Sequence, residues 1–264
     1  MKKYFVIGNP IDHSLSPKLH NFWINNNNLD AYYDRKKLEV NQIEKFILDC
    51  KSNKVAGINV TVPFKKTVIP YLDKLSFEAE KTQSVNTIIL KDGYLTGYNT
   101  DIIGFQTAIE KLNFNIKKKK IFILGAGGVV PSLIFALEKM NVLEIKLTNR
   151  TIERAKNLKT QFNNLEIVEW GKVPDFDVII NATSLGLKNE DINLNFSKVG
   201  QNKLFYDVIY NPQETNFLKV GKETGNIAEN GILMFVYQAL EAFNMWHGIK
   251  PEINNETIEI LNND

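Results

Sequence analysis

The segment VAGINVTVPFKK, residues 55–66, ends in two lysines that follow polar strand residues. Asn59 and Thr61 alternate with apolar residues, so they share one face of the strand that this segment predicts. In open α/β sheets, ligands bind outside the strand ends. An amide, a hydroxyl and an amine placed there can hold a polar ligand and transfer a proton. Spacing alone does not distinguish Lys65 from Lys66 as the reactive amine.

A glycine cluster lies in ILGAGGVVPS, residues 123–132, between an apolar run and a helical pattern. Gly125, Gly127 and Gly128 permit a tight turn and a close backbone approach to a pyrophosphate, and the helix that follows adds N–H groups and a positive dipole end. The standard spacing has a third glycine where this chain has Val130. A tight turn without a ligand is the alternative, but the order strand, glycines, helix and second strand favours dinucleotide binding.

The residues at the end of the second strand of this region favour NADP over NAD. An NAD-specific site presents Asp or Glu there for the ribose 2′-hydroxyl. This chain instead presents Asn149, Arg150 and Thr151, followed by Arg154. An arginine can bind a 2′-phosphate and stack on adenine. A basic surface loop without a ligand is the alternative interpretation.

The composition of the 264 residues, with 44% hydrophobic residues, 23% charged residues and a net charge of +2, is ordinary for a globular protein. This charge balance gives no reason to expect a nucleic-acid or membrane partner, and no apolar run approaches the length of a membrane span. Cys50 is the only cysteine, which excludes an intrachain disulfide and fits a cytoplasmic location. The three histidines have no ligand spacing, so we expect no metal site.

A nicotinamide enzyme that acts on an alcohol without zinc needs another group for proton transfer. The Tyr-x-x-x-Lys pair of short-chain reductases occurs as Tyr32/Lys36 and as Tyr33/Lys37. Both pairs precede the glycine cluster, whereas that mechanism places the pair after it, so we reject them. A lysine or an acid from the other domain, across the cleft, is the third solution.

Apolar runs alternate with helical patterns in the first part of the chain. The strand at 56–62 should bury Val62 with the other apolar residues of its face. Pro63 can open a short helix that Pro70 ends, and residues 92–93 are a hairpin turn signal. We predict strands at 3–8, 31–38 and 56–62, a hairpin within 84–100, and helices at 17–25, 41–51 and 102–112.

From residue 120 the pattern becomes a tighter strand–helix alternation, which is typical of a parallel sheet covered by helices. The chain is therefore predicted to be α/β, with two units, a boundary near 101–118 and a return crossing near 230. We predict strands at 120–128, 144–150, 177–183 and 203–210, and helices at 129–140, 152–162, 230–248 and 254–261.

Nine motifs occur in the order found in the shikimate dehydrogenase family, which the chain resembles over nearly its whole length. Nine motifs in order are far more specific than any one of them. They are GNPIDHSLSPKLHN (8–21), GINVTVPFK (57–65), SVNTI (84–88), GYNTDIIG (97–104), GAGG (125–128), NRT (149–151), NATSLG (181–186), DVIYNP (207–212) and NGILMFVYQA (230–239).

The resemblance implies a substrate-binding and catalytic domain at 1–101, a Rossmann-like NADP-binding domain at 102–231, and C-terminal helices at 232–264 that pack back on the substrate domain. It implies the reversible, NADPH-dependent reduction of 3-dehydroshikimate to shikimate in the biosynthesis of aromatic amino acids. A monomer or a homodimer is expected, with a small molecule as the only ligand besides the cofactor.

The resemblance also implies the site residues, motif by motif. The catalytic pair is Lys65 and Asp101, and the substrate carboxylate meets Ser14 and Ser16. The ring hydroxyls are surrounded by Thr61, Asn86, Asp101, Tyr210 and Gln238. The cofactor contacts Gly125, Ala126, Gly127, Gly128, Val129, Asn149, Arg150, Thr151, Arg154, Val208 and Gly231.

Some of these residues also have a purely structural interpretation. Ser16 can cap the helix that Pro17 opens, Asn86 can belong to an ordinary strand-end turn, and Gln238 can lie on the polar edge of an amphipathic helix.

The role of Lys65 follows from its acidic neighbour. Asp101 favours the ammonium form of the lysine. In the reducing direction we therefore interpret Lys65 as a cationic donor that polarises the ketone and supplies a proton, while Asp101 holds the substrate hydroxyl and orients the ammonium.

Two rival functions stay open at the level of sequence. One is a paralogue related to quinate/shikimate dehydrogenases, which often carry an acidic residue where this chain has Arg150. The other is a non-catalytic NADP-binding regulator on the same fold, which would tolerate the loss of Lys65 or Asp101.

Overall fold

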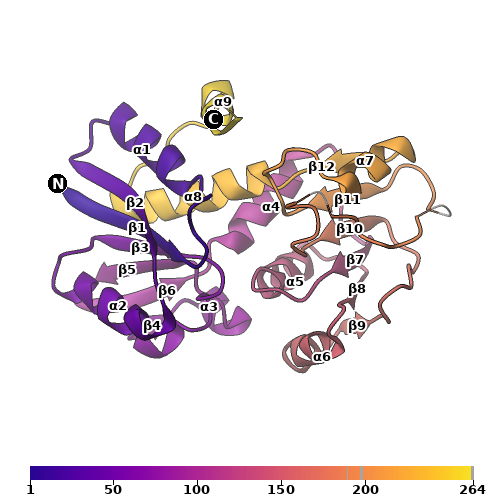
Figure 1. The fold of residues 1–264 in the computed structure, drawn as a ribbon, viewed down its shortest axis with the longest axis horizontal. Coiled ribbons are helices and arrows are strands. Elements are labelled where there is room, and N and C mark those ends of the chain that lie inside the picture. The colour runs from indigo at the N-terminus through magenta and orange to yellow at the C-terminus, as the bar shows by residue number, and fades with distance from the viewer. Residues whose placement is uncertain (189, 197–198, 263–264) are drawn as a thin grey trace. The chain divides into compact units, whose positions relative to one another are not determined.

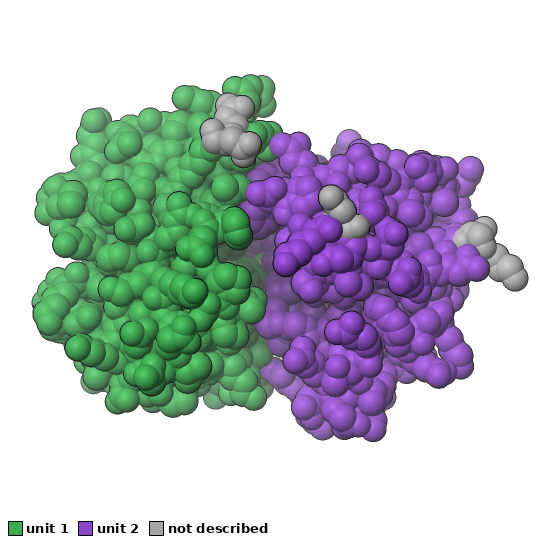
Figure 2. All heavy atoms as spheres, viewed as in Figure 1, with its two compact units in different colours: residues 1–101, 236–264 green, residues 102–235 purple. Residues whose placement is uncertain are grey.

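The computed structural model describes residues 1–188, 190–196 and 199–262. The chain forms two compact units: unit 1 comprises residues 1–101 and 236–264, and unit 2 comprises residues 102–235 (Figure 2). Both units combine strands and helices, which confirms the predicted α/β class. Within the described residues, no helix has the length and apolar character that crossing a membrane requires.

Unit 1 is built on a six-stranded mixed sheet in the order β2-β1-β3-β5-β6-β4 (Figure 1). Strand β1 pairs in parallel with β2 and β3, whereas β5 runs antiparallel to β3 and β6. The strands are β1 (Lys2–Gly8), β2 (Ala31–Lys37), β3 (Gly57–Val60), β4 (Lys74–Leu75), β5 (Thr87–Lys91) and β6 (Tyr94–Tyr98). The helices are α1 (Ser16–Asn26), α2 (Ile43–Lys51), α3 (Phe77–Thr82), α9 (Asn255–Asn262) and most of α8 (Ile232–His247), with short 3-10 helices η1 (Val40–Gln42) and η2 (Ile69–Tyr71).

Helices cover both faces of this sheet because strand β1, which lies between β2 and β3, is apolar on both sides. Successive strand residues point to opposite faces. Ile7 packs in the cluster to which α2 contributes Phe46, whereas the Tyr4 ring lies 5.0 Å from that of Trp246 in α8. The ends of β1 and β3 are thus held between two apolar layers, which fixes the position of the loops that leave them.

The segment after β3 differs from the prediction. Strand β3 ends at Val60, and a run of turns leads to η2, so the α-helix expected to open at Pro63 is wrong. Val62 was expected in the sheet packing, but its side chain is 56% exposed. Beyond Val60 the chain keeps two backbone hydrogen bonds to the end of β1 and the residue after it: Thr61 N donates to Ile7 O, and Asn9 N donates to Val62 O. It no longer follows the strand pleat.

Unit 2 is a parallel sheet in the order β12-β11-β10-β7-β8-β9 (Figure 1). Counted from β7, this is the strand order of a dinucleotide-binding Rossmann fold, whose ligands bind where the order reverses, between β7 and β10. The strands are β7 (Lys120–Leu124), β8 (Glu144–Thr148), β9 (Leu165–Ile167), β10 (Val178–Asn181), β11 (Leu204–Asp207) and β12 (Ile227–Glu229). The helices are α4 (Asp101–Lys111), α5 (Val130–Lys139), α6 (Ile152–Gln161) and α7 (Asn216–Glu223).

Both faces of the second sheet are buried. Ile121 and Ile123 of β7 pack in one cluster with residues of α4, α5 and α6, whereas Phe122 packs in another with residues of α7. Met234, in the first turn of α8, belongs to the first cluster, which explains why unit 2 extends beyond Gly231.

Two α-helices were not predicted, and each begins at a hydroxyl cap. Ser76 accepts a hydrogen bond from Ala79 N at the start of α3, and Thr215 accepts one from Leu218 N at the start of α7. Both are N-cap residue types. The two helices have 6 and 8 residues, which is shorter than the window over which a helical period is read, although α7 does bury one face with Phe217 and Leu218.

Candidate active site

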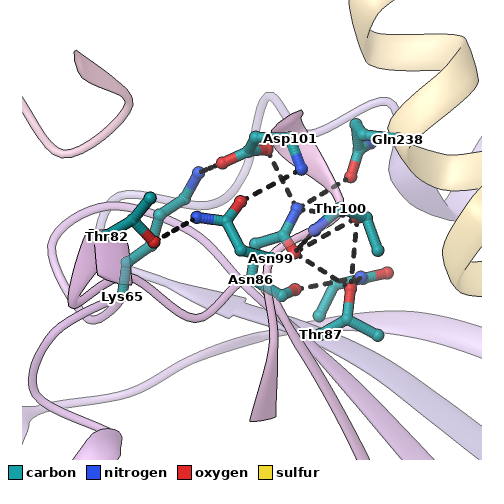
Figure 3. A network of polar contacts seen from close by, with 9 residues as sticks. Lys65, Thr82, Asn86, Thr87, Asn99, Thr100, Asp101 and Gln238 are labelled. Atoms are coloured by element: carbon teal, nitrogen blue, oxygen red, sulfur yellow. Dashed lines mark hydrogen bonds and ion pairs between the residues drawn. The ribbon is translucent and has the colours of Figure 1, made fainter. Parts of the chain in front are cut away.

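Lys65 and Asp101 form a nearly buried ion pair in unit 1 (Figure 3). Lys65 lies in the turns after β3, and Asp101 is the first residue of α4, where the helix dipole favours a carboxylate. The Lys65 Nζ atom donates to Asp101 Oδ2 at 2.5 Å, and the two side chains are 12% and 8% exposed. Asn86 Nδ2 donates to the other carboxylate oxygen at 2.9 Å, so both oxygens of Asp101 have a donor.

The Asn86 side chain is the centre of a polar network around this pair. It lies just before β5, and only 3% of the residue is exposed. Its Oδ1 accepts a hydrogen bond from Thr100 N at 2.7 Å, and its Nδ2 lies 3.4 Å from Gln238 Oε1 of α8 (Figure 3). The structure therefore brings together four residues predicted from widely separated motifs: Lys65, Asn86, Asp101 and Gln238.

The serine motif lies at the start of α1. Ser14 is half-buried, and its Oγ accepts a hydrogen bond from Ser16 N at 3.3 Å. The proposed capping role of Ser16 is wrong, because Leu15 is the N-cap and Ser16 is already the first helical residue. Thr61 is half-buried directly after β3. The structure gives each of these hydroxyls a defined position in unit 1.

Sequence reasoning missed Thr100 and left Asn99 without a role. Asn99 Oδ1 accepts a hydrogen bond from Asp101 N at 3.2 Å, and Asn99 Nδ2 donates to Thr82 Oγ1 at 2.9 Å. Asn99 therefore fixes the first turn of α4, from which Asp101 projects (Figure 3). The signal was present, since both residues precede Asp101 in the motif GYNTDIIG, but a short polar run before a helix is common.

The glycine loop of unit 2 follows β7. Gly125 has φ +107°, and its N–H donates to Thr148 O at 2.8 Å. A Cβ atom there would lie 2.8 Å from Ala182 O, so position 125 admits no side chain. The conformation and the close approach of two backbones both require glycine.

The next residues lead into α5. The N-cap of this helix is Val129, which offers no side-chain cap, and Ala126 is half-buried against the core. A Cβ at Gly128 would meet no atom within 4 Å, and one at Gly127 would meet only Ala182 O at 3.7 Å. Open space beside an uncapped helix N-terminus fits the approach of a phosphate group.

The basic segment lies next to this loop. Leu124 and Thr148 are register partners of the parallel strands β7 and β8, so Asn149 follows directly beside Gly125. Asn149 Nδ2 donates to Thr151 O at 2.7 Å and shapes the turn. Arg150 and Arg154 are exposed, the first in the turn and the second in the first turn of α6. Two guanidinium groups near a phosphate loop fit a dinucleotide that carries an additional phosphate.

Two further predicted cofactor residues are packed backbone to backbone. Gly231 N donates to Ile209 O at 3.1 Å, and a Cβ at Gly231 would lie 2.3 Å from Val208 O.

Tyr210 stacks on Phe235 with ring centroids 4.7 Å apart, and burial raises its pKa to about 12. Tyr210 thus lies in unit 2, with the predicted cofactor residues.

A buried carboxylate ties the loops of unit 2 together. Asp207 ends β11 and accepts hydrogen bonds from Asn181 Nδ2 at 3.1 Å, Ile209 N at 3.0 Å and Thr215 Oγ1 at 2.6 Å. Burial raises the pKa of Asp207 to about 6, although these three bonds act in the opposite direction. Asp207 therefore holds together the loops that follow β10 and β11.

Among residues 1–188, 190–196 and 199–262, no group of three or more His, Cys, Asp or Glu side chains is placed to hold a metal ion.

Two family models match most of the chain. The family model "Shikimate dehydrogenase substrate binding domain" matches residues 6–88, and "Shikimate / quinate 5-dehydrogenase" matches residues 106–213. A shikimate dehydrogenase (NADP(+)) of Pelagibacter ubique is 55% identical over 263 residues, which cover 99% of each chain.

Solved structures of shikimate dehydrogenases are similar to the chain over nearly its whole length. The shikimate dehydrogenase of Aquifex aeolicus is 37% identical with a TM-score of 0.90, covering 100% of this chain and 98% of that chain. The shikimate 5-dehydrogenase of Thermus thermophilus, solved in complex with NADP(H) and shikimate, is 29% identical with a TM-score of 0.90, covering 99% of each chain. Identity of this extent over the full length shows that the chain belongs to the shikimate dehydrogenase family.

Proposed function

We propose that the protein catalyses the reversible, NADP-dependent interconversion of shikimate and 3-dehydroshikimate, with reduction as the biosynthetic direction. The observation that carries this proposal is the Lys65–Asp101 pair, 2.5 Å apart and nearly buried, in a setting of amides and hydroxyls. Such a setting suits a small polar substrate and contains a positioned proton donor. The family membership given by relatives named shikimate dehydrogenase (NADP(+)) supports the same reaction.

The substrate has a carboxylate and three ring hydroxyls, so its site needs many short polar side chains. Each unmatched buried polar group would cost about 1–3 kcal/mol. We assign the carboxylate to Ser14 and Ser16, which lie together at the start of α1. We assign the ring hydroxyls to Thr61, Asn86, Asp101, Gln238 and Tyr210.

The chemistry divides between the cofactor and the pair. Bound NADPH supplies the hydride. Lys65 holds a proton at Nζ, polarises the ketone oxygen and donates that proton as the alcohol forms. Asp101 orients the ammonium and accepts a hydrogen bond from a neighbouring substrate hydroxyl. Because Asn86 and Asn99 already hold Asp101, the carboxylate needs little reorganisation during the reaction.

Cofactor binding is assigned to unit 2. Gly125 to Val129 would receive the pyrophosphate at the N-terminus of α5. Asn149, Thr151 and the guanidinium groups of Arg150 and Arg154 would hold the adenosine 2′-phosphate. Val208 and Gly231, whose backbones touch, would border the nicotinamide side.

We propose a cytoplasmic location for the protein. A reducing cytoplasm suits a chain with one cysteine, Cys50, which is buried. We propose a monomer or a homodimer, which sedimentation of the purified protein would distinguish.

The direct test is product identification. Purified protein is incubated with shikimate and NADP, and the organic product is identified by mass spectrometry. We expect 3-dehydroshikimate together with one equivalent of NADPH. Binding of NADP without turnover would instead favour a regulatory protein on the same fold.

A further inference from the structure

A buried hydrogen-bond path leads from strand β2 to the Lys65–Asp101 pair. The Tyr33 hydroxyl donates to Asn59 Oδ1 at 2.7 Å, and Asn59 Nδ2 donates to Thr87 Oγ1 at 3.0 Å. Thr87 Oγ1 donates to Asn86 Oδ1 at 3.1 Å, and Asn86 Nδ2 donates to Asp101 Oδ1 at 2.9 Å. None of these five residues is more than 6% exposed. The path therefore runs inside the protein, away from competing water.

Groups that can act in only one way fix the orientation of the two amides in the path, whereas the Thr87 hydroxyl also lies 3.4 Å from Thr100 Oγ1. The backbone N–H of Thr100 can only donate, and it donates to Asn86 Oδ1, so Asn86 Nδ2 must face Asp101. The backbone carbonyl of Asn86 can only accept, and it accepts from Asn59 Nδ2 at 3.1 Å. Asn59 Oδ1 therefore faces Tyr33, whose hydroxyl must be the donor.

The start of the path is closely packed. The Tyr33 ring stacks on the buried ring of His20, with centroids 4.2 Å apart and an interplanar angle of 4°, and it lies 6.1 Å from the ring of Trp246. Burial also raises the pKa of the Tyr33 hydroxyl well above its usual value, which keeps the donor protonated. Tyr33 thus anchors Asn59 from across strand β1.

We propose that Tyr33, Asn59 and Thr87 are positioning residues that act on the catalytic pair through Asn86. Thr100 determines which way round the Asn86 amide lies, and the path from Tyr33 determines where it lies relative to Asp101. The proposal rests on the proposed function. A displacement of about 1 Å at a reacting group can cost up to about a hundredfold in rate, so a polar path behind the site can affect kcat without touching the substrate.

The matched variants Thr87→Val and Thr87→Ser test the path against simple packing. Valine keeps the shape of the side chain and loses the hydroxyl, whereas serine keeps the hydroxyl and loses a methyl group. We expect Thr87→Val to lower kcat by about three- to tenfold, with KM for NADP unchanged, and Thr87→Ser to stay near wild type. If Thr87 acts only through packing, the order is reversed, and that result would overturn the proposal.

A second variant tests the far end of the path. Tyr33→Phe should lower kcat by about three- to tenfold. It should cost less in a Thr87→Val background, because only the bond from Asn59 Nδ2 to the Asn86 carbonyl then connects Tyr33 with Asn86. Tyr32→Phe is the control, because Tyr32 is the neighbour of Tyr33 in β2 and is 45% exposed. Thermal unfolding of each variant shows whether it is folded. The same decrease in kcat from Tyr33→Phe in both backgrounds, or no decrease in either, would contradict the path. Failure of the wild type to oxidise shikimate would instead reject the proposed function.

Discussion

Replacement of Lys65 by methionine removes the ammonium and nearly preserves the length of the side chain. In the wild type, this ammonium lies 2.5 Å from an Asp101 carboxylate that is 8% exposed. Removing one partner of a buried ion pair costs about 3–5 kcal/mol of folding free energy. Asp101 keeps the hydrogen bond from Asn86, so we expect about 3 kcal/mol or less. Loss of a positioned proton donor should lower kcat by about 10²–10⁴-fold.

The assay measures both quantities on the same preparations. kcat comes from the change in nicotinamide absorbance at saturating shikimate and NADP, and the free energy of unfolding comes from urea titration without ligands. Lys66→Met is the matched control, because the neighbouring lysine is exposed. This control should change kcat by no more than about twofold, as is usual for surface substitutions.

Lys65→Arg separates proton transfer from electrostatics. Arginine keeps a cation beside Asp101 but does not release its proton in proteins. We expect a stability near that of the wild type and a kcat within about tenfold of the methionine variant. A Lys65→Met enzyme with near-normal kcat would refute the catalytic role. Full activity of Lys65→Arg would reduce that role to charge stabilisation.

Three further perturbations test other parts of the account. Arg150→Ala should raise KM for NADP about 10–100-fold and leave KM for NAD nearly unchanged, because a charge-assisted bond contributes about 1.5–3 kcal/mol; Lys156→Ala on α6 is the control, and equal effects on both cofactors would contradict the assignment. Burial raises the pKa of Asp207 to about 6 in the folded protein, from 3.8 in the unfolded chain. The folded state therefore binds the proton more tightly, and the wild type should lose up to about 3 kcal/mol of stability as pH rises from about 4 to 6. Urea titrations of Asp207→Asn at several pH values should show that this pH-dependent contribution is removed. An unchanged slope of the free energy of unfolding against pH would contradict it. Burial lowers the pKa of His20 to about 3 in the folded protein, from 6.5 in the unfolded chain. Protonation of the unfolded chain should therefore destabilise the fold by up to about 5 kcal/mol as pH falls from about 6.5 to 3. His20→Phe should resist acid better than the wild type in the same titration, and equal acid sensitivity would refute this.

The elements with long, regular patterns were predictable from the sequence. The apolar run of β7, the glycine cluster and the helix that follows appear in the structure in the predicted order, because a buried parallel strand and an amphipathic helix each leave a clear period. The alternation around Asn59 also predicted correctly that Ile58 and Val60 are buried. It failed at Val62, where the chain leaves the strand, because alternation gives no sign of where pairing stops.

The motifs supplied the site residues, and the arrangement around them came from the structure. The contact between Tyr33 and Asn59 depends on a strand order in which β1 lies between β2 and β3. Strand order is not encoded in the local pattern of either segment. For the same reason, the sequence suggests Tyr33 only as half of the Tyr33/Lys37 pair. In the structure its hydroxyl donates to Asn59 on strand β3.

The central claim is the joint preference for shikimate and NADP, and the most direct measurement is kcat/KM for the four combinations of shikimate or quinate with NADP or NAD. Arg150 and Arg154 beside the glycine loop predict the highest value for shikimate with NADP, by about tenfold or more over each alternative. Faster turnover of quinate with NAD would contradict the account and favour the quinate-type paralogue.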